Sequence, residues 1–116
     1  MDDFLRAALL LDFYGDMLTD RQKQAYGMYY NENFSLREIS ENLSITRQGV
    51  RDLIKRADVI MVDYENKLKL IERDERLTRM ADEIINMLKS ISIDENPETQ
   101  NKINDVINKI RQLGEV

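Results

Sequence analysis

Apolar residues between Ser35 and Ile54 have the spacing of two short helices that cross at a steep angle and share one small core. That arrangement is a helix-turn-helix. Both helices also carry start signals. Ser35 with Glu38 forms a capping box before the first helix, and Thr46 supplies an N-cap oxygen before the second. The apolar positions of the motif are Ile39, Leu43, Ile45, Val50 and Leu53.

Two serines depart from the usual residues of this motif. Ser40 stands where the close contact between the helices prefers alanine, and Ser44 stands in the turn where glycine is preferred. A positive φ is energetically unfavourable for a non-glycine residue, so Ser44 should destabilise the turn slightly. Serine is small enough for both positions, and the helix-turn-helix prediction stands.

The segment before the motif predicts two further helices. Residues 4–14 are apolar almost all round, which is typical of a buried helix, and Gly15 should end it. Thr19 and Gln22 form a second capping box, which opens a helix to about Tyr30. Its tyrosines, near Arg21 and Lys23, could stack on RNA bases, but at this spacing they favour core packing on the motif.

From Thr46 the helical pattern runs for about 45 residues without proline or a helix-ending glycine, too long to bury against a small domain. Heptad positions along it predict a seam with a second helix. The heptad frame slips across Glu72 to Arg76, where a charged hinge is plausible. The seam predicts a homodimer whose interface includes Met61, Tyr64, Leu68, Ile71, Leu77, Ile84 and Leu88.

A break near 92–97 separates the last predicted helix, with Asn96 as N-cap and Pro97 at its first position. The helix carries the apolar residues Ile103, Val106, Ile107, Ile110 and Leu113. The acidic residues Asp94, Glu95 and Glu98 lack the spacing of a calcium loop and suit a solvated connector. The predicted organisation is a helix-turn-helix domain over 1–60 and a helical, dimerising extension over 61–116.

Composition narrows the chemistry. The chain has no Cys, His or Trp, which excludes disulfides, thiol nucleophiles, imidazole bases and zinc sites built from Cys or His. We therefore expect no enzyme, no catalytic residue, no cofactor and no metal. The apolar run 7–11 is too short to span a bilayer, and the acidic start is unlike a signal peptide. A cytoplasmic protein with no membrane insertion is predicted.

The net charge of −5 opposes long-range attraction to nucleic acid. The second motif helix differs locally, because between Thr46 and Arg56 four cations face the single acid Asp52, a balance of +3. This helix would enter a DNA major groove. The alternative is a solvated face supported by an Asp52–Arg56 pair four residues apart. The pattern alone leaves both open.

Several segments resemble the YlxM-like family. They are DFYGDMLTDRQ (12–22), YY (29–30), SLREIS (35–40), TRQGVRDLIKR (46–56) and YENKLKL (64–70), so the resemblance covers roughly 9–71. The family is similar to sigma-factor region 4 in its helix-turn-helix half. Its members are typically encoded beside the GTPase of the bacterial signal recognition particle, which implies a regulatory part in that protein-targeting pathway.

Carried over from sigma factors, the resemblance implies base-proximal positions for Arg47, Gln48 and Arg51. It implies phosphate contacts for Ser35, Arg37 and Lys55, with Thr46 at the start of the same surface.

The sequence thus predicts an all-α fold and a non-enzymatic regulator. In one interpretation it binds DNA through residues 46–56. In the other, the same surface binds a protein or RNA component of the signal recognition particle.

Overall fold

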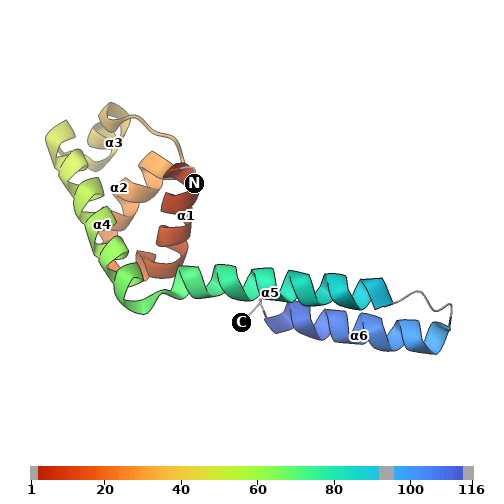
Figure 1. The fold of residues 1–116 in the computed structure, drawn as a ribbon. Helices are drawn as coiled ribbons and strands as arrows, with labels where there is room; N and C mark the ends of the chain where they lie inside the picture. The colour runs from red at the N-terminus through yellow and green to blue at the C-terminus, as the bar shows by residue number, and fades with distance from the viewer. Residues whose placement is uncertain (1–2, 92–95, 114–116) are drawn as a thin grey trace. The chain divides into compact units, whose positions relative to one another are not determined.

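The computed structural model describes residues 3–91 and 96–113, and within those ranges it contains six α-helices, one short 3-10 helix and no strand (Figure 1). The all-α prediction is confirmed. No helix in the described ranges is long and apolar enough to cross a membrane. The elements in chain order are α1 (Asp3–Tyr14), η1 (Gly15–Met17), α2 (Asp20–Tyr30), α3 (Leu36–Leu43), α4 (Arg47–Leu68), α5 (Leu70–Ile91) and α6 (Pro97–Leu113).

The chain divides into two compact units, Met1–Ile71 and Glu72–Val116. The division between 60 and 61 that we predicted falls inside α4, which belongs entirely to the first unit. The first unit contains the motif, and the second contains nearly all of α5 together with α6.

The predicted helix starts are confirmed. Thr19 and Ser35 each accept a hydrogen bond from the backbone N–H three residues on, and the side chains of Gln22 and Glu38 accept one from the N–H of the cap residue. Thr46 Oγ1 accepts a hydrogen bond from Gly49 N at 2.9 Å. Each cap satisfies backbone donors that a helix start leaves without a partner. Gly15 follows the last residue of α1, as predicted.

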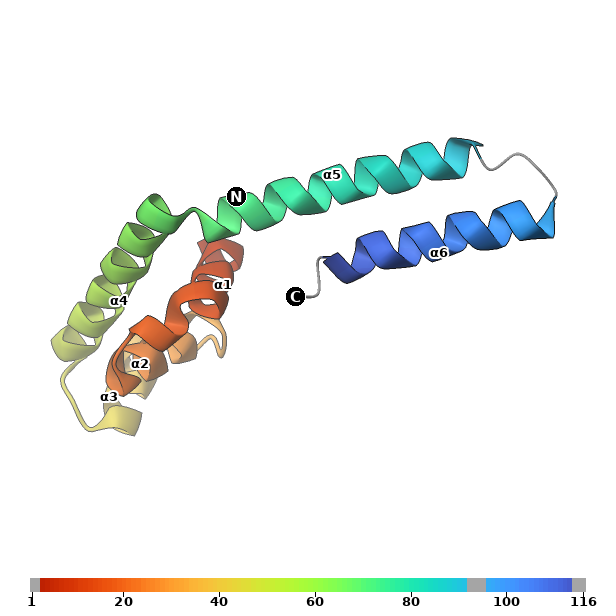
Figure 2. The same ribbon diagram turned by 90° about the horizontal axis from the view of Figure 1, so that it is seen from below.

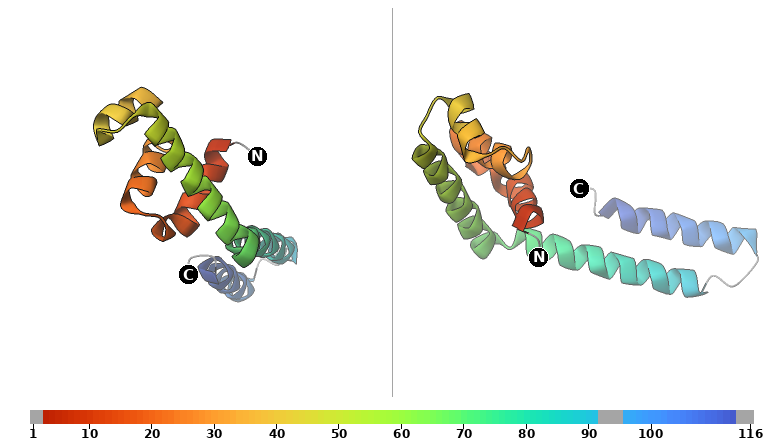
Figure 3. Two further views of the ribbon diagram at one scale, coloured as in Figure 1. Left: turned by 90° about the vertical axis from the view of Figure 1, so that its left-hand side faces the viewer. Right: turned by 90° about the horizontal axis from the view of Figure 1, so that it is seen from above.

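Helix α4 joins the two hydrophobic clusters of the first unit, because it packs across both α1 and α2 (Figure 3, left). The first cluster gathers buried residues of α1, α2 and α4 around Tyr14 and Tyr26. The second lies under the motif, where Ala25, Ile39 and Val50 are fully buried. Tyr26 is thus a core residue, and Tyr29 and Tyr30 pack on these clusters, which confirms the core interpretation of the tyrosines.

The helical pattern that continues from Thr46 is interrupted at Lys69, a few residues before the hinge that the sequence indicated. Lys69 adopts a left-handed conformation with φ 57° and ends α4. Glu72 to Arg76, the predicted hinge, lies inside α5. The break depends on tertiary partners, which the local sequence does not reveal.

Tyr14 of α1 and Glu65 of α4 organise this break. The Tyr14 hydroxyl donates to Glu65 Oε1 at 2.5 Å and accepts from Leu70 N at 3.2 Å. Glu65 Oε1 also accepts from Ile71 N at 3.0 Å. Two of the free N–H groups at the start of α5 are thereby satisfied. The Tyr14 ring stacks on Tyr64, with centroids 6.1 Å apart.

Three residues that we assigned to the dimer seam pack within the first unit instead. Met61 has no exposed surface, and Tyr64 and Ile71 pack against the first cluster. Met61 therefore belongs to the core of the first unit, where residues of α1, α2 and α4 pack together. Of the other predicted seam residues, Leu68, Leu77 and Ile84 are exposed and Leu88 is half-buried.

The second unit is a pair of helices that run antiparallel alongside each other (Figure 2). Asn96 Oδ1 accepts from Glu98 N at 3.0 Å, so Asn96 caps α6 and Pro97 is its first residue, as predicted. Ile85 of α5 and Ile107 of α6 are its buried hydrophobic residues within the described ranges. Asp94 and Glu95 lie outside the described residues.

Candidate nucleic-acid interface

The turn between α3 and α4 fixes the direction in which α4 leaves the motif. Ser44 has φ 56° and ψ 43°, the left-handed conformation that the sequence indicated. The amides of Ser44 and Ile45 both donate to Ser40 O, which closes the end of α3. Arg21 of α2 adds a hydrogen bond from Nη1 to Leu43 O at 3.2 Å. Arg21 therefore supports the turn, a role that the sequence did not indicate.

Ser40 occupies the close helix contact without leaving a buried hydroxyl unsatisfied. Its side chain is buried, and Oγ donates to Arg37 O at 2.7 Å. This bond to the backbone of the preceding turn explains why serine is accepted where alanine is preferred.

The first turns of α4 present opposite faces to the core and to solvent. Val50 is fully buried in the second cluster. On the other face, four predicted contact residues are all exposed: Arg47, Gln48, Arg51 and Lys55. Helical spacing thus brings the predicted base-proximal residues together on one exposed face.

The cations of this face are not neutralised by the acids beside them. Asp52 Oδ1 accepts from Gln48 Nε2 at 3.1 Å, and the Asp52–Arg56 pair considered from the sequence is not among the ion pairs of the described residues. Within the same ranges, no ion pair involves Arg47, Arg51 or Lys55 either. The predicted charge of +3 on this helix segment therefore faces solvent.

The three remaining predicted contacts already have partners of their own. Arg37 Nε pairs with Glu41 Oε1 at 3.2 Å, in an exposed pair that is easily exchanged. The Ser35 and Thr46 oxygens accept the capping bonds of α3 and α4. Each hydroxyl still has one hydrogen to donate, so capping does not prevent either from binding a phosphate oxygen.

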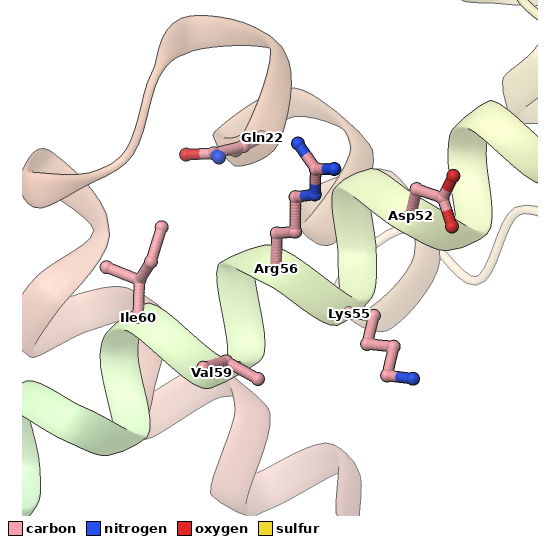
Figure 4. Close-up of a pocket in the computed structure, with 6 residues that line it drawn as sticks. All are labelled: Gln22, Asp52, Lys55, Arg56, Val59 and Ile60. Atoms are coloured by element: carbon pink, nitrogen blue, oxygen red, sulfur yellow. The ribbon is translucent and has the colours of Figure 1, made fainter.

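A shallow groove lies between α2 and α4, beside the cationic face (Figure 4). Its volume is about 380 Å³. In the close-up the Arg56 side chain extends towards Gln22 of α2, and the Lys55 side chain extends away from the groove. Its lining combines two cations with apolar surface: Gln22, Asp52, Lys55, Arg56, Val59 and Ile60. Sequence reasoning missed this groove, because it depends on how α2 crosses α4.

A polar network ties α1 and α2 to α4 below the groove. The Tyr26 hydroxyl donates to Asp58 Oδ1 at 3.0 Å, and Arg6 Nη1 lies 3.5 Å from the same oxygen. Burial raises the pKa of the Tyr26 phenol well above its usual value, and the hydrogen bond to Asp58 raises it further. Tyr26 thus stays protonated and holds Asp58 in place.

The described residues offer no cluster of His, Cys, Asp and Glu that could hold a metal ion. The cationic face contains guanidinium, ammonium, amide and hydroxyl groups, which bind anions rather than activate a nucleophile.

Comparisons with known proteins agree with this architecture. Residues 1–106 match the UPF0122 family, described as "Putative helix-turn-helix protein, YlxM / p13 like". A UPF0122 protein of Clostridium kluyveri is 40% identical over 107 residues, which cover 92% of this chain and 96% of the relative. A UPF0122 protein of Thermoanaerobacter sp. (strain X514) is 42% identical over 113 residues, 97% of each chain. Because the family match extends to residue 106 and the relatives match over nearly their whole length, the chain belongs to the UPF0122 family of helix-turn-helix proteins, YlxM / p13 like.

Proposed function

We propose that this chain is a non-enzymatic regulatory protein that binds DNA through the first half of α4. The observation that carries the proposal is the pair Arg47 and Arg51, both exposed and outside the ion pairs of the described residues. In helix-turn-helix proteins the start of the second helix enters the major groove. Arginine recognises guanine there through two parallel hydrogen bonds.

Each residue of the interface has a role that suits its chemistry. Arg47, Gln48 and Arg51 contact base edges. Gln48 releases its hydrogen bond to Asp52 and binds adenine instead. Lys55 and Arg37 bind phosphates. The Ser35 and Thr46 hydroxyls donate to phosphate oxygens at the two helix starts.

The charge distribution makes the interaction short-ranged. The whole chain carries −5, whereas residues 46–56 carry +3. Long-range steering towards DNA is therefore weak, and affinity depends on a few direct phosphate contacts. Binding should weaken with salt, and removing Lys55 should lower the slope of log K against log salt by about 1.

The double substitution Arg47→Ala and Arg51→Ala tests the proposal. Each base contact is worth about 1–3 kcal/mol, so the double variant should lose specific binding by roughly two orders of magnitude or more. Arg73→Ala with Arg79→Ala is the matched control, because it removes two exposed arginines from α5. Selection of bound duplexes from a random library, then anisotropy titrations across salt concentrations, supply the measurement. Absence of saturable, sequence-dependent binding by the wild type at low salt would refute DNA recognition.

The cellular context that we propose is the signal recognition particle pathway, which rests on the resemblance to the YlxM-like family. A second candidate function follows from it, in which the same surface binds a protein or RNA component of the targeting particle. The groove beside Arg56 favours a protein, because its apolar lining suits an apolar side chain and its cations suit an acidic segment.

One substitution separates the two candidates. Val59 lines the groove but lies on a later turn than the base-proximal residues, and 61% of it is exposed. Val59→Ser should weaken capture of a targeting-particle protein and leave DNA affinity within about twofold, since it removes apolar surface from the groove and adds no charge four residues from Lys55. Loss of DNA binding in this variant, with the helical content unchanged, would contradict the assignment of base contacts to Arg47, Gln48 and Arg51 rather than to the groove.

A further inference from the structure

A row of exposed apolar side chains runs along α5 in the second unit. Its five residues have exposures between 44% and 70%. Their spacing alternates between three and four residues, which is the spacing of a helix seam rather than of scattered surface positions. We call them the outer seam: Leu77, Met80, Ile84, Met87 and Ile91.

A different face of α5 is the one that α6 covers. Ile85 is 6% exposed, Ala81 and Leu88 are half-buried, and these three residues share one side of the helix. On α6, Ile107 is buried, whereas Val106 and Leu113 are exposed. Both helices thus leave apolar residues that the other does not cover.

The second unit has a very small core for its length. Within the described ranges, Ile85 and Ile107 are its only buried hydrophobic residues. Two helices with so small a core are marginal in isolation, because most helix stability comes from packing an apolar face. Four helices around a shared core form a common stable arrangement.

We propose that the outer seam of α5, extended by Val106 and Leu113 of α6, is the interface with a second copy of this chain. Two α5–α6 pairs then form one four-helix bundle and complete each other's core. This homodimer surface is separate from the DNA surface of α4 and does not depend on it. Relative to the sequence prediction, it keeps Leu77 and Ile84, leaves out Leu88, and adds Met80 and Met87.

The size of the exposed surface fits a second copy. The seven uncovered residues are large and 43–76% exposed, so together they present several hundred Å² of largely apolar surface, on the order of the roughly 800 Å² that each partner of a standard-size interface buries. A seam with 3-4 spacing packs against a helix of the same spacing, and the second copy supplies one.

Charge disfavours two other occupants. Residues 72–116 carry seven cations and ten acids, a net −3. An anionic lipid surface or a nucleic acid would therefore be repelled from this unit.

Sedimentation equilibrium of the full chain at tens of micromolar tests the interface. The wild type should be a dimer. Met80→Glu with Met87→Glu should raise the dimer dissociation constant at least about a hundredfold, because four carboxylates would be buried without partners. Leu5→Glu with Met17→Glu is the matched control, since both residues are exposed apolar positions of the first unit. This variant should remain a dimer.

Each alternative result is informative. A monomeric wild type would overturn the proposal, as would a seam variant that still dimerises like the wild type. Dissociation of the control variant would also overturn it, because the interface would then include the first unit. Circular dichroism of each variant shows whether helical content is retained.

Cysteine crosslinking gives a second test that does not depend on stable seam variants. The chain has no native cysteine, so any disulfide dimer reports the introduced position alone. Ile84→Cys or Met87→Cys should crosslink under mild oxidation at low micromolar concentration. Asp82→Cys and Lys89→Cys, exposed on the opposite side of α5, should not. Equal crosslinking at all four positions would contradict a specific seam.

Discussion

The Tyr14 hydroxyl should be one of the most consequential single groups in the first unit, and Tyr14→Phe removes it alone. Tyr14 is 1% exposed, and its ring packs in the first cluster against Tyr64. Phenylalanine keeps that packing. What is lost is the hydrogen bond to Glu65 at 2.5 Å and the acceptor for Leu70 N at 3.2 Å.

The expected destabilisation is about 2–3 kcal/mol. A hydrogen bond to a charged group contributes about 1.5–3 kcal/mol, and a buried partner left unsatisfied costs more than the bond itself suggests. Two features limit the loss. Glu65 keeps its bond from Ile71 N at 3.0 Å, and Leu70 is 38% exposed, so water can reach the start of α5. The destabilisation should therefore not exceed about 3 kcal/mol.

Urea unfolding followed by tyrosine fluorescence measures the stability of the first unit, where Tyr14 lies. All five tyrosines lie in residues 1–71 and the chain has no tryptophan, so the signal reports the first unit. Tyr64→Phe is the matched control, since no hydrogen bond among the described residues involves the Tyr64 hydroxyl. This substitution should lower the unfolding free energy by less than about 0.5 kcal/mol.

A double-mutant cycle with Glu65→Gln isolates the pairwise contribution. The coupling energy should be at least about 1 kcal/mol, because the hydroxyl and the carboxylate share one network. Additive losses, or a Tyr14→Phe effect no larger than that of Tyr64→Phe, would refute the role of this pair in the break between α4 and α5.

Two further predictions concern the turn and alkaline pH. Ser44→Gly should stabilise the first unit by about 0.5–1 kcal/mol, since Ser44 has φ 56° and glycine adopts this conformation without strain; urea unfolding measures it, and a loss of stability would contradict the strain argument. Burial and hydrogen bonds raise the pKa values of Tyr14 and Tyr26 in the folded protein, so their contribution is complete below pH 10 and is lost as pH rises above it. The fall in unfolding free energy between pH 9 and pH 11 should be smaller in Tyr26→Phe than in the wild type, and equal slopes would exclude Tyr26 as a cause.

Local signals in the sequence were sufficient to predict the helix starts and the turn of the motif. The cap oxygens of Thr19, Ser35 and Thr46 bond to amides three residues away, so no distant contact is needed to predict them. The same holds for Ser44, whose place in the helix-turn-helix spacing indicated a left-handed conformation. These features are local because the interacting atoms lie within one turn of each other.

Features that depend on long-range partners were missed. The end of α4 at Lys69 is supported by a hydroxyl from Tyr14, over 50 residues away in sequence. The groove beside Arg56 needs α2, and the Arg21 bond to Leu43 O needs the two helices to cross. No periodicity within α4 itself carries this information.

The seam predicted on α4 shows how local and long-range information differ. Ile54, Met61 and Leu68 recur every seven residues, as does the outer seam on α5, and the two patterns cannot be told apart by spacing alone. In the first unit, α1 is apolar almost all round and covers Met61, so the pattern describes an intramolecular contact. On α5, the outer seam stays exposed beside a helix that already covers the neighbouring face. Apolar periodicity thus identifies a face that must be covered, and only the burial of that face in the fold shows whether its partner belongs to the same chain.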